Sequence, residues 1–454
     1  MRKLTVFLFL FVSAGILHGQ TWKNMTFENS PIGFASVNIL GLNGTTGGAG
    51  ADTVQITDNA TLVTDIATRV KTNKKPVVYV INGTITGSGQ ISCKNVNNIT
   101  FIGKGTDALM DGVGIQICNA TNIIVRNIRF RNCKPDCITV NTTSSSATHH
   151  VWIDHCTFSD DPEIDLSSSG THDGLLDVTH RSSYVTISWC EFHNHDKVSL
   201  LGYTDNASDE VDQLRTTYHH NWWNNTVQRH PRVRHALCHV FDNYYDGSKT
   251  AATTIGMGTD LGVGYGITST CEADVLVESN YFDKVYHPTE IGQGSSPAGD
   301  LVARYNFTNN GPVLTRSTHT TPFEASTFYS YTLDSAANVP SIVQAGAGAG
   351  KLGITTGITE KGLNTQPISF LLNQNFPNPF NPSTVINWQL PASGFVTLKV
   401  YNTIGKEVAA LVSGYQAAGS YSSKFNAANL PSGLYFYTLK TANFSQTKKM
   451  LLLK

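Results

Sequence analysis

The 454-residue sequence contains few charged residues, and neither sign is in large excess. Lys, Arg, Asp and Glu together make up only 14% of the chain, and the formal net charge is −1. This composition excludes a chain-wide positive field that would attract nucleic acid, and equally a chain-wide negative field. Any site for a charged partner must therefore be built locally, from the few charges that cluster.

Long apolar runs are also absent, apart from one at the N-terminus. Residues 4–17 are almost wholly apolar, follow a short basic region at Arg2 and Lys3, and precede Gly19. This layout is typical of a secretory signal peptide, which we place at residues 1–19 with cleavage near Gly19. The run is shorter than the ~20 residues of a membrane span, so we expect a secreted protein without a membrane span.

The sequence has no C-x-x-C pair, which argues against a zinc site built from such pairs. Its eight cysteines stand at positions 93, 118, 133, 137, 156, 190, 238 and 271. Export would allow one or two disulfides, although the spacing does not assign their partners. Alternatively, the cysteines are small hydrophobic side chains buried in a core. The sequence alone leaves both interpretations open.

Short segments in the middle of the chain resemble one another. Each begins with alternating β-branched or apolar residues, and most end in Asn, His or Cys before an aromatic residue; they are residues 97–103, 122–130, 150–158, 184–192, 215–223, 238–245, 274–282 and 301–307. The closing aromatic residues are Phe130, Phe158, Phe192, Trp223, Tyr245, Phe282 and Phe307, spaced 28, 34, 31, 22, 37 and 25 residues apart. One strand per irregular repeat predicts a solenoid, because a lone strand cannot bury its face until coils stack. We therefore expect a parallel β-helix rather than a β-sandwich, which would need two-residue hairpin turns that are rare here.

The composition changes towards the C-terminus. Residues 344–366 are rich in Gly, Ala and Thr, which indicates a domain edge, and we place a linker at residues 354–366. Residues 367–454 then show short strand patterns separated by turn residues. This pattern predicts a small β-sandwich of about seven strands.

One motif of this C-terminal unit is distinctive. The stretch NQNFPNPFNPSTVINWQLP (373–391), followed by VTLKVYNTIGKEV and LPSGLYFYTLKT, resembles the C-terminal sorting domain of type IX secretion cargo. The resemblance implies export across a bacterial outer membrane by the type IX machinery, then release or surface attachment. The alternative is an ordinary carbohydrate-binding module, which would more typically show an exposed aromatic platform.

Basic residues are few, but they cluster between positions 197 and 234. The run QRHPRVR (228–234) contains three arginines within six residues. On a strand, Arg232 and Arg234 would point to the same face, while Pro231 places Arg229 at a bend or a strand edge. A guanidinium group can bind a carboxylate through two hydrogen bonds, so the run suits a polymer of carboxylates. A solvated basic face or internal ion pairs would also explain the charges.

THDGLLD (171–177) carries two carboxylates four residues apart, Asp173 and Asp177. On a straight strand they would lie ~13 Å apart, but Gly174 permits a bend that would bring them together. With a third carboxylate from another coil they would suit Ca²⁺, which takes about six to eight oxygen ligands. The alternative is that these aspartates only cap turns.

Several segments together resemble polysaccharide lyase family 1, the pectate lyases. They are VWIDHCTF (151–158), HDGLLDVTHRSSYVTISWCEFHNHDKVSLLGYTD (172–205), TTYHHNWWNNTVQRHPRVRHALCHVFDNYYDG (216–247) and AGAGAGKLG (345–353). The resemblance implies a right-handed parallel β-helix, so the expected fold is all-β, with this solenoid at residues 20–353 and the small sandwich after it.

The resemblance also implies roles for individual residues. Asp136, Asp173 and Asp177 match the ligands of a calcium ion. Lys197 and Arg234 match residues that bind substrate carboxylates, Arg232 fits the same groove, and Arg229 matches the catalytic base. The expected partner is the acidic polysaccharide polygalacturonate.

This chain departs from the family pattern in two places. Extra residues within TTSSSATHH (142–150) separate the PDCITV segment from WIDH, and His235 and Ala236 stand where Phe-Gly is usual. Within WIDH, we interpret Asp154 and His155 as a buried hydrogen-bonded pair with a structural role.

The implied activity is calcium-dependent cleavage of α-1,4-polygalacturonate by β-elimination to unsaturated oligogalacturonates, by a monomer that binds no nucleic acid. Three alternatives remain. A pectin lyase would act on methylated, neutral pectin, and the aspartates at 173 and 177 argue against it. A β-helix glycoside hydrolase would need a paired acid and base and would form no double bond. A non-catalytic surface protein would bind the polysaccharide without shortening it.

Overall fold

The computed structural model describes residues 30–71, 75–145, 147–161, 173–207, 209–247, 263–309 and 323–352, and, nearer the C-terminus, 371–372, 375, 378–390, 393–417, 419–442 and 444–453. The chain divides into two compact units, residues 1–354 and 355–454. The expected signal peptide (1–19) and linker (354–366) lie outside the described residues. No helix among the described residues is long and apolar enough to cross a membrane.

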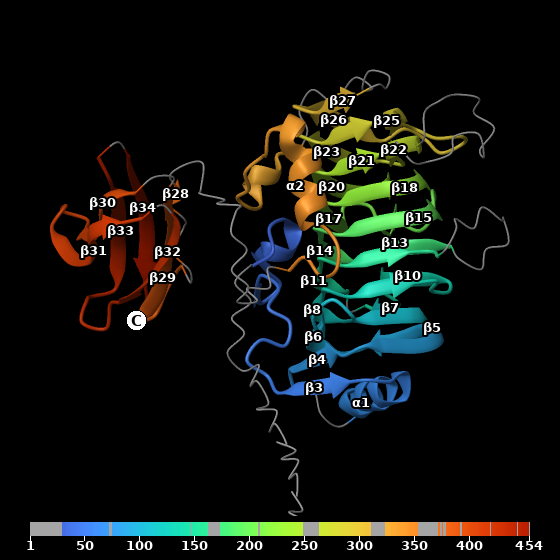
Figure 1. The fold of residues 1–454 in the computed structure, drawn as a ribbon, viewed down its shortest axis with the longest axis horizontal. Helices are drawn as coiled ribbons and strands as arrows, with labels where there is room; N and C mark the ends of the chain where they lie inside the picture. The colour runs from blue at the N-terminus through green and yellow to red at the C-terminus, as the bar shows by residue number, and fades with distance from the viewer. Residues whose placement is uncertain are drawn as a thin grey trace, which may run out of the picture. The chain divides into compact units, whose positions relative to one another are not determined.

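The first unit is a parallel β-helix, as the repeats predict (Figure 1). One sheet has ten parallel strands in the spatial order β26 (Asp300–Arg304), β23 (Asp274–Glu278), β20 (Ala236–Phe241), β17 (Leu214–His219), β14 (Ser183–Ser188), β11 (His149–Asp154), β8 (Thr121–Arg126), β6 (Asn97–Gly103), β4 (Val77–Ile81) and β3 (Thr53–Ile56). Strands of successive coils pair along this sheet, so every interior strand has partners on both sides.

A second sheet of 15 strands forms the other walls of the coil stack. Its order is β25 (Val285–Ile291), β22 (Val263–Thr270), β19 (Arg232–Arg234), β16 (Leu200–Leu201), β13 (Gly174–Val178), β10 (Asp136–Asn141), β7 (Leu109–Cys118), β9 (Arg129–Arg131), β12 (Thr157–Ser159), β15 (Glu191–Lys197), β18 (Trp222–Gln228), β21 (Tyr244–Asp246), β24 (Tyr281–Asp283) and β27 (Phe307–Asn309), with β5 (Thr84–Lys94) paired to β7. β7 joins the two walls because its first residues pair with β9 and its later residues pair with β10.

A single residue in the left-handed conformation turns the chain from the ten-strand sheet into the second sheet. These corner residues are Asn127, His155, Trp189, His220, Asp242, Ser279 and Tyr305, with φ between 48° and 63°. The expectation of one strand per repeat is therefore wrong, because most repeat segments bend at a corner and supply two strands. The sequence hides the bend, since none of these corners uses Gly, although this conformation costs other residues roughly 1–2 kcal/mol.

The interior is lined by side chains that stack from coil to coil. The aromatic rings of Phe130, Phe158, Phe192, Trp223, Tyr245 and Phe282 stack in this order with centroids 4.5 to 5.7 Å apart. Phe307 was expected in the same stack but lies outside it: it is exposed and packs on Tyr281, because β27 pairs Phe307 with Tyr281 and places Thr308 opposite Phe282. The stack otherwise follows the repeat predicted from the sequence.

An asparagine ladder runs beside the aromatic stack. The side-chain Oδ1 atoms of Asn221, Asn243, Asn280 and Asn306 each accept a hydrogen bond, at 2.8 to 2.9 Å, from a backbone N–H of the preceding coil. The ladder satisfies the backbone donors that the corners leave unpaired, which explains why Asn recurs in the repeats.

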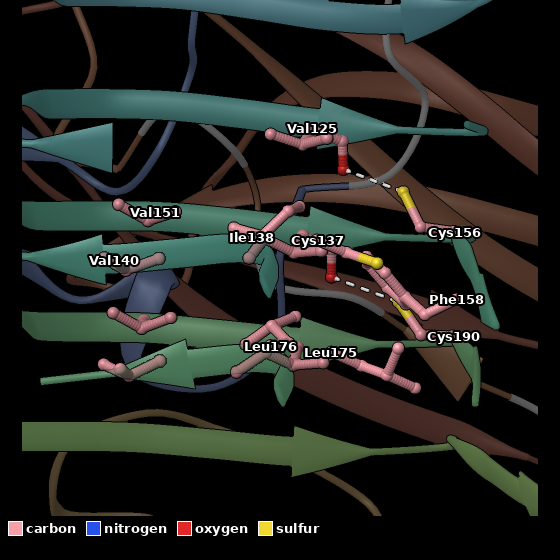
Figure 2. Packing of buried hydrophobic residues seen from close by; sticks show 14 of the residues in the cluster. Val125, Cys137, Ile138, Val140, Val151, Cys156, Phe158, Leu175, Leu176 and Cys190 are labelled. Carbon is pink, nitrogen blue, oxygen red and sulfur yellow. Dashed lines mark hydrogen bonds between the residues drawn. The ribbon is translucent and has the colours of Figure 1, made fainter. Parts of the chain in front are cut away.

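All eight cysteines are buried and unpaired, so the structure supports the hydrophobic interpretation and not the disulfide one. Figure 2 shows Cys156 and Cys190 among Val125, Val151 and Phe158 in the core. The thiol of Cys156 donates to the carbonyl of Val125, and that of Cys190 to the carbonyl of Ile153. They act as small side chains that fill the narrow coil interior.

Two segments cover parts of the coil stack. The helix α1 (Asn59–Lys71) lies at the β3 end (Figure 1) and buries Leu62 and Ile66 in the core. It begins after Asp58, whose carboxylate accepts a hydrogen bond from Thr61 N at 2.8 Å.

Residues 323–352, here called the strap, contain the short helices η4 (Ala325–Thr327) and η5 (Ala336–Asn338) and the helix α2 (Val339–Gly346). The strap packs on the outside of the coils, where Tyr329 joins Phe34 of η2 (Phe34–Ser36) in a small apolar cluster. A short hairpin of β1 (Asn38–Ile39) and β2 (Leu42–Asn43) follows η2.

The second unit consists of two antiparallel sheets, as the sequence predicts. One contains β28 (Leu371–Leu372), β29 (Ser383–Leu390) and β32 (Gly419–Asn426), and the other β31 (Glu407–Gln416), β30 (Gly394–Asn402), β33 (Gly433–Lys440) and β34 (Ser445–Leu452). Buried residues from both sheets, including Trp388 and Tyr437, form one apolar core. This arrangement is a small β-sandwich.

Candidate active site

Two of the predicted aspartates meet on adjacent strands. β10 pairs with β13 so that Asp136 stands opposite Gly174 and Thr139 opposite Asp177. Asp136 Oδ1 accepts from Gly174 N at 2.8 Å, and Asp136 Oδ2 accepts from Thr139 Oγ1 at 2.9 Å. Asp177 Oδ1 accepts from Leu200 N at 2.9 Å. Both carboxylates are therefore fixed by hydrogen bonds, and each still has lone pairs for another ligand.

Gly174 leaves the space that the two carboxylates share. A Cβ atom at this position would lie 2.9 Å from Asp177 Oδ1 and 3.1 Å from Asp136 Oδ1. Gly174 is an ordinary strand residue without a left-handed φ, so the expectation that it provides a bend is wrong. Its missing side chain, and not its flexibility, lets the carboxylates converge over the strand.

The third aspartate lies at the rim of this acidic site. The Asp173 side chain is 52% exposed, and its Oδ1 lies 3.3 Å from Lys197 Nζ. Single oxygens of Asp136, Asp173 and Asp177 do not all come within 4.8 Å of one another. The structure thus brings Asp136 and Asp177 together and turns Asp173 towards Lys197.

Burial makes negative charge costly at this site. Burial, and next the neighbouring charge of Asp136, raise the pKa of Asp177 to about 8. Burial is also the main reason that the pKa of Asp136 is raised. A divalent cation would relieve both effects, since the available ligands are carboxylate oxygens and Gly174 leaves room for an ion. The residues therefore fit a hard cation such as Ca²⁺.

Arg229 lies between β18 and β19, at the bend that Pro231 predicts. Its φ is 63°, and its carbonyl accepts from Ser199 N at 2.9 Å, which fixes the backbone. The side-chain Nε is buried and has no hydrogen-bond partner within the described ranges. Arg229 is near enough to Asp177 and to Arg232 for its charge to act on both.

Arg232 and Arg234 share one face of β19, since Val233 between them is fully buried. Arg232 Nη2 donates to Ser296 Oγ at 2.7 Å, and Arg234 Nε donates to Asp205 Oδ1 at 2.6 Å. Ser296 Oγ in turn donates to Asp205 Oδ2 at 2.6 Å. One carboxylate thus holds both arginines, directly or through Ser296.

Sequence reasoning missed Asp205 and Ser296. Asp205 ends the matching segment HDKVSLLGYTD, so its position in a shared motif was an available signal. Ser296 lies in a turn after β25 and gave no signal, because only the folded coil places it beside β19.

The departures from the family pattern lie away from the carboxylates. The extra residues of 142–150 form the connection from β10 to β11, where Thr143 N donates to Asn119 Oδ1 at 2.8 Å. His235 occupies a left-handed corner after β19, with its Nε2 3.2 Å from the carbonyl of Thr204. Neither change disturbs the pairing of β10 with β13.

The WIDH motif is structural, as interpreted from the sequence. Asp154 is buried and accepts hydrogen bonds from Arg126 Nε at 2.8 Å and Ser188 Oγ at 2.6 Å, and its Oδ2 lies 2.7 Å from His155 Nδ1. It lies on the ten-strand sheet, whereas the aspartates at 136 and 177 belong to the second sheet.

Comparison with known proteins identifies both units. A model of the pectate lyase family matches residues 7–352, and a model of the secretion system C-terminal sorting domain matches residues 374–453. The chain is 33% identical over 374 residues to the pectate trisaccharide-lyase of Thermotoga maritima, and the aligned region covers 76% of this chain and 94% of that protein. It is 32% identical over 359 residues to pectate lyase A of Aspergillus niger, covering 76% and 98% of the two chains.

A solved structure agrees with these relatives. The pectate lyase of Bacillus sp. N165, in complex with trigalacturonate, superposes with a TM-score of 0.61 at 33% identity, covering 71% of this chain and 99% of that chain. The C-terminal sorting domain implies secretion or attachment to the outer surface. The chain belongs to the pectate lyases of polysaccharide lyase family 1 and carries a type IX secretion sorting domain.

Proposed function

We propose that this protein cleaves α-1,4-polygalacturonate by calcium-dependent β-elimination and releases unsaturated oligogalacturonates. The observation that carries the proposal is the convergence of the half-buried Asp136 on β10 and the buried Asp177 on β13 with arginines on and before β19. The contact of Lys197 with Asp173 links the two charge clusters. A polymer with one carboxylate per sugar needs such cations along its path.

In this proposal Asp136, Asp173 and Asp177 hold Ca²⁺. The support is the all-oxygen donor set, the space over Gly174, and the cost of burying two carboxylates without a cation. When bound, the ion would neutralise the substrate carboxylate beside the reacting carbon and stabilise the charge that develops there.

Lys197, Arg232 and Arg234 bind substrate carboxylates. The guanidinium groups of Arg232 and Arg234 lie on one face of β19 and are held by Asp205 and Ser296, so little rotamer freedom has to be lost when substrate binds. Lys197 stands opposite Gln228 in the pairing of β15 with β18, and Gln228 directly precedes Arg229 in the sequence. The three side chains would keep the polymer in register with the reacting sugar.

Arg229 takes the C5 proton. The electron pair of the C5–H bond forms the C4=C5 double bond, the C4–O bond breaks, and water supplies a proton to the leaving glycosidic oxygen. Arginine is normally protonated, with a pKa above ~12, so its neutral form has to be favoured locally. The Nε of Arg229 is buried and has no hydrogen-bond partner among the described residues, so no carboxylate of the described protein holds this nitrogen.

A spectrophotometric assay tests this function. Purified protein is incubated with polygalacturonate, with and without Ca²⁺, and formation of the unsaturated product is followed by ultraviolet absorbance. Activity that requires Ca²⁺ and falls on methylated pectin is expected. Activity that survives chelation and prefers methylated pectin would identify a pectin lyase, while depolymerisation without a double bond would identify a hydrolase. Because one relative is named a trisaccharide-lyase, chromatography should look for the unsaturated trimer.

The proposal includes the organisation of the chain: a signal peptide at 1–19, a catalytic domain at 20–353, a linker at 354–366 and a sorting domain at 367–454, in a monomer. The match of the pectate lyase family model up to residue 352, the division of the chain after residue 354 and the match of the sorting domain from residue 374 support the boundaries between catalytic domain, linker and sorting domain. Intact mass of the exported protein would show which ends are removed, and light scattering would show whether it is a monomer.

A further inference from the structure

A second cluster of possible metal ligands lies at the corner between the two sheets. His220 and Asp242 are left-handed corner residues of successive coils, and Asp334 belongs to the strap. His220 precedes β18 and Arg229 follows it, so roughly 20 Å of strand separates this cluster from Arg229. The cluster is therefore a separate feature of the fold.

The three side chains have the spacing of ligands around one ion. One donor atom from each of His220, Asp242 and Asp334 lies within 4.8 Å of the others, the one such group among the residues that the structure describes. His220 Nε2 lies 3.1 Å from Asp334 Oδ2 and 3.9 Å from Asp242 Oδ2. Ligands bound at ~2.0–2.2 Å to a shared ion have separations of this size.

An unsatisfied buried oxygen points independently to a missing ligand. The Asp242 side chain is 0% exposed, and its Oδ1 has no hydrogen-bond partner among the residues that the structure describes. Ser279 Oγ lies near this carboxylate, but its single hydrogen is donated to the carbonyl of Asp334 at 2.5 Å. Asp242 Oδ2 accepts one hydrogen bond from the described residues, from Asp334 N at 3.1 Å. An unpaired buried oxygen of this kind costs about 1–3 kcal/mol, which a cation would remove.

The histidine is held in an orientation that suits metal binding. His220 Nδ1 lies 3.0 Å from Nδ1 of His219, and its ring stacks on Trp189 with centroids 4.2 Å apart. When His220 Nδ1 donates this hydrogen bond, the lone pair of Nε2 faces the two carboxylates. Metal-binding histidines commonly use the second ring nitrogen in this way.

We propose that His220, Asp242 and Asp334 bind a divalent transition-metal ion of the Zn²⁺ class, with water completing its coordination. One imidazole and two carboxylates suit such an ion, whereas Ca²⁺ requires more oxygen ligands. The 40% exposed Asp334 leaves a route from solvent. Because Asp334 is 92 residues from Asp242 in sequence, the ion fastens the strap to the coil corners.

Isothermal titration with Zn²⁺ tests the site in the full chain, prepared without a histidine tag. The reference protein carries Asp136→Asn and Asp177→Asn, here called the background. These substitutions remove the two carboxylates expected to bind Ca²⁺, so the result is independent of calcium binding and lyase activity. One equivalent of Zn²⁺ is expected to bind and to raise the melting temperature, and Co²⁺ in its place is expected to show visible d–d absorption.

Two further substitutions and a control decide the assignment. Asp242→Asn and Asp334→Asn should each weaken Zn²⁺ binding at least tenfold, and the second, at a partly exposed site, should fold even if the first does not. Asp107→Asn, at an exposed loop position, should bind as the background does. Absence of Zn²⁺ binding in the background, or equal affinity in Asp334→Asn, would refute the proposal and leave only an ion pair of His220 with Asp334.

Discussion

Buried carboxylates on the two large sheets of the β-helix have different partners. On the ten-strand sheet, the buried carboxylates Asp154 and Glu278 are each surrounded by donors: Arg126 and His155 in one case, His239 and Arg304 in the other. On the second sheet, Asp177 is nearly as buried but accepts a single backbone hydrogen bond, and the Nε of Arg229, between β18 and β19, has no partner in the part of the chain that the structure describes. Charges that are paired internally stabilise the fold, while charges left without partners are available to an ion and a substrate.

The largest effect that would test this difference is expected at Arg229. Arg229→Lys keeps a positive charge but cannot place the guanidinium, so kcat on polygalacturonate should fall at least about 10³-fold while substrate binding persists. Arg215→Lys, on the ten-strand sheet, is the matched control and should retain activity. Near-normal turnover of Arg229→Lys, measured by ultraviolet absorbance, would remove Arg229 from the role of base.

On the ten-strand sheet, the corresponding loss should be one of stability. Glu278 is 2% exposed and contacts His239 Nε2, Arg304 Nε and Tyr331 OH at 2.6 to 2.9 Å. Glu278→Gln should therefore lower the free energy of unfolding by about 3 kcal/mol at pH 7, because it leaves buried partners unpaired. Glu324→Gln, whose carboxylate pairs with the same Arg304 but is 42% exposed, should cost under about 1 kcal/mol.

The same variant has a pH signature. Burial alone would raise the pKa of Glu278, but hydrogen bonds from His239, Tyr331 and Arg304 outweigh it and lower the pKa from 4.5 to about 2. The unfolded chain then binds the proton more readily, so this stabilisation is complete above pH 4.5 and is lost as the pH falls towards 2. The difference in melting temperature between wild type and Glu278→Gln should shrink over this range, and a constant difference would contradict the assignment.

A methyl group at Gly174 should weaken Ca²⁺ binding by Asp136 and Asp177 without removing a charge. In Gly174→Ala the new Cβ would press against Oδ1 of Asp177 and Oδ1 of Asp136, at 2.9 and 3.1 Å. We expect the affinity for Ca²⁺, measured by titration calorimetry, to fall roughly tenfold with little change in melting temperature. Gly414→Ala, where a Cβ meets nothing within 4 Å, is the control. Unchanged Ca²⁺ affinity would mean that the ion is not held over Gly174.

The arrangement of the arginines and of the interior aromatic stack could be predicted because their sequence signals are local. Arg232 and Arg234 of QRHPRVR fall on one strand with Arg229 at the bend before it, and all but the last of the aromatic residues that close the repeats mark the interior stack. Features that depend on contacts between coils could not be predicted in the same way. The corners at His220 and Asp242 carry no glycine signal, Asp334 reaches the coil corner from 92 residues away, and the space beside Gly174 exists only once β10 and β13 pair.

The smallest expected effect separates the position of Arg234 from its charge. Asp205 accepts from Arg234 Nε and Ser296 Oγ at 2.6 Å each. Asp205→Ala removes both hydrogen bonds, and the loss of about 1 kcal/mol of positioning should raise KM roughly fivefold with kcat unchanged. Asp205→Asn keeps an acceptor for Arg234 while removing a negative charge that repels the polymer, so its KM should stay near the wild-type value or fall.

Asp209→Asn is the matched control for Asp205, since its exposed carboxylate lies in the same loop but 3.7 Å from Arg181 instead. Initial rates over a range of polygalacturonate concentrations measure both parameters. If Asp205→Ala also lowered KM, release of positive charge would outweigh positioning, and the arginines would act as a diffuse field. If kcat fell with KM unchanged, Arg234 would act on the reacting sugar itself. Two arginines, Arg229 and Arg234, would then take part in the chemical step in place of Arg229 alone.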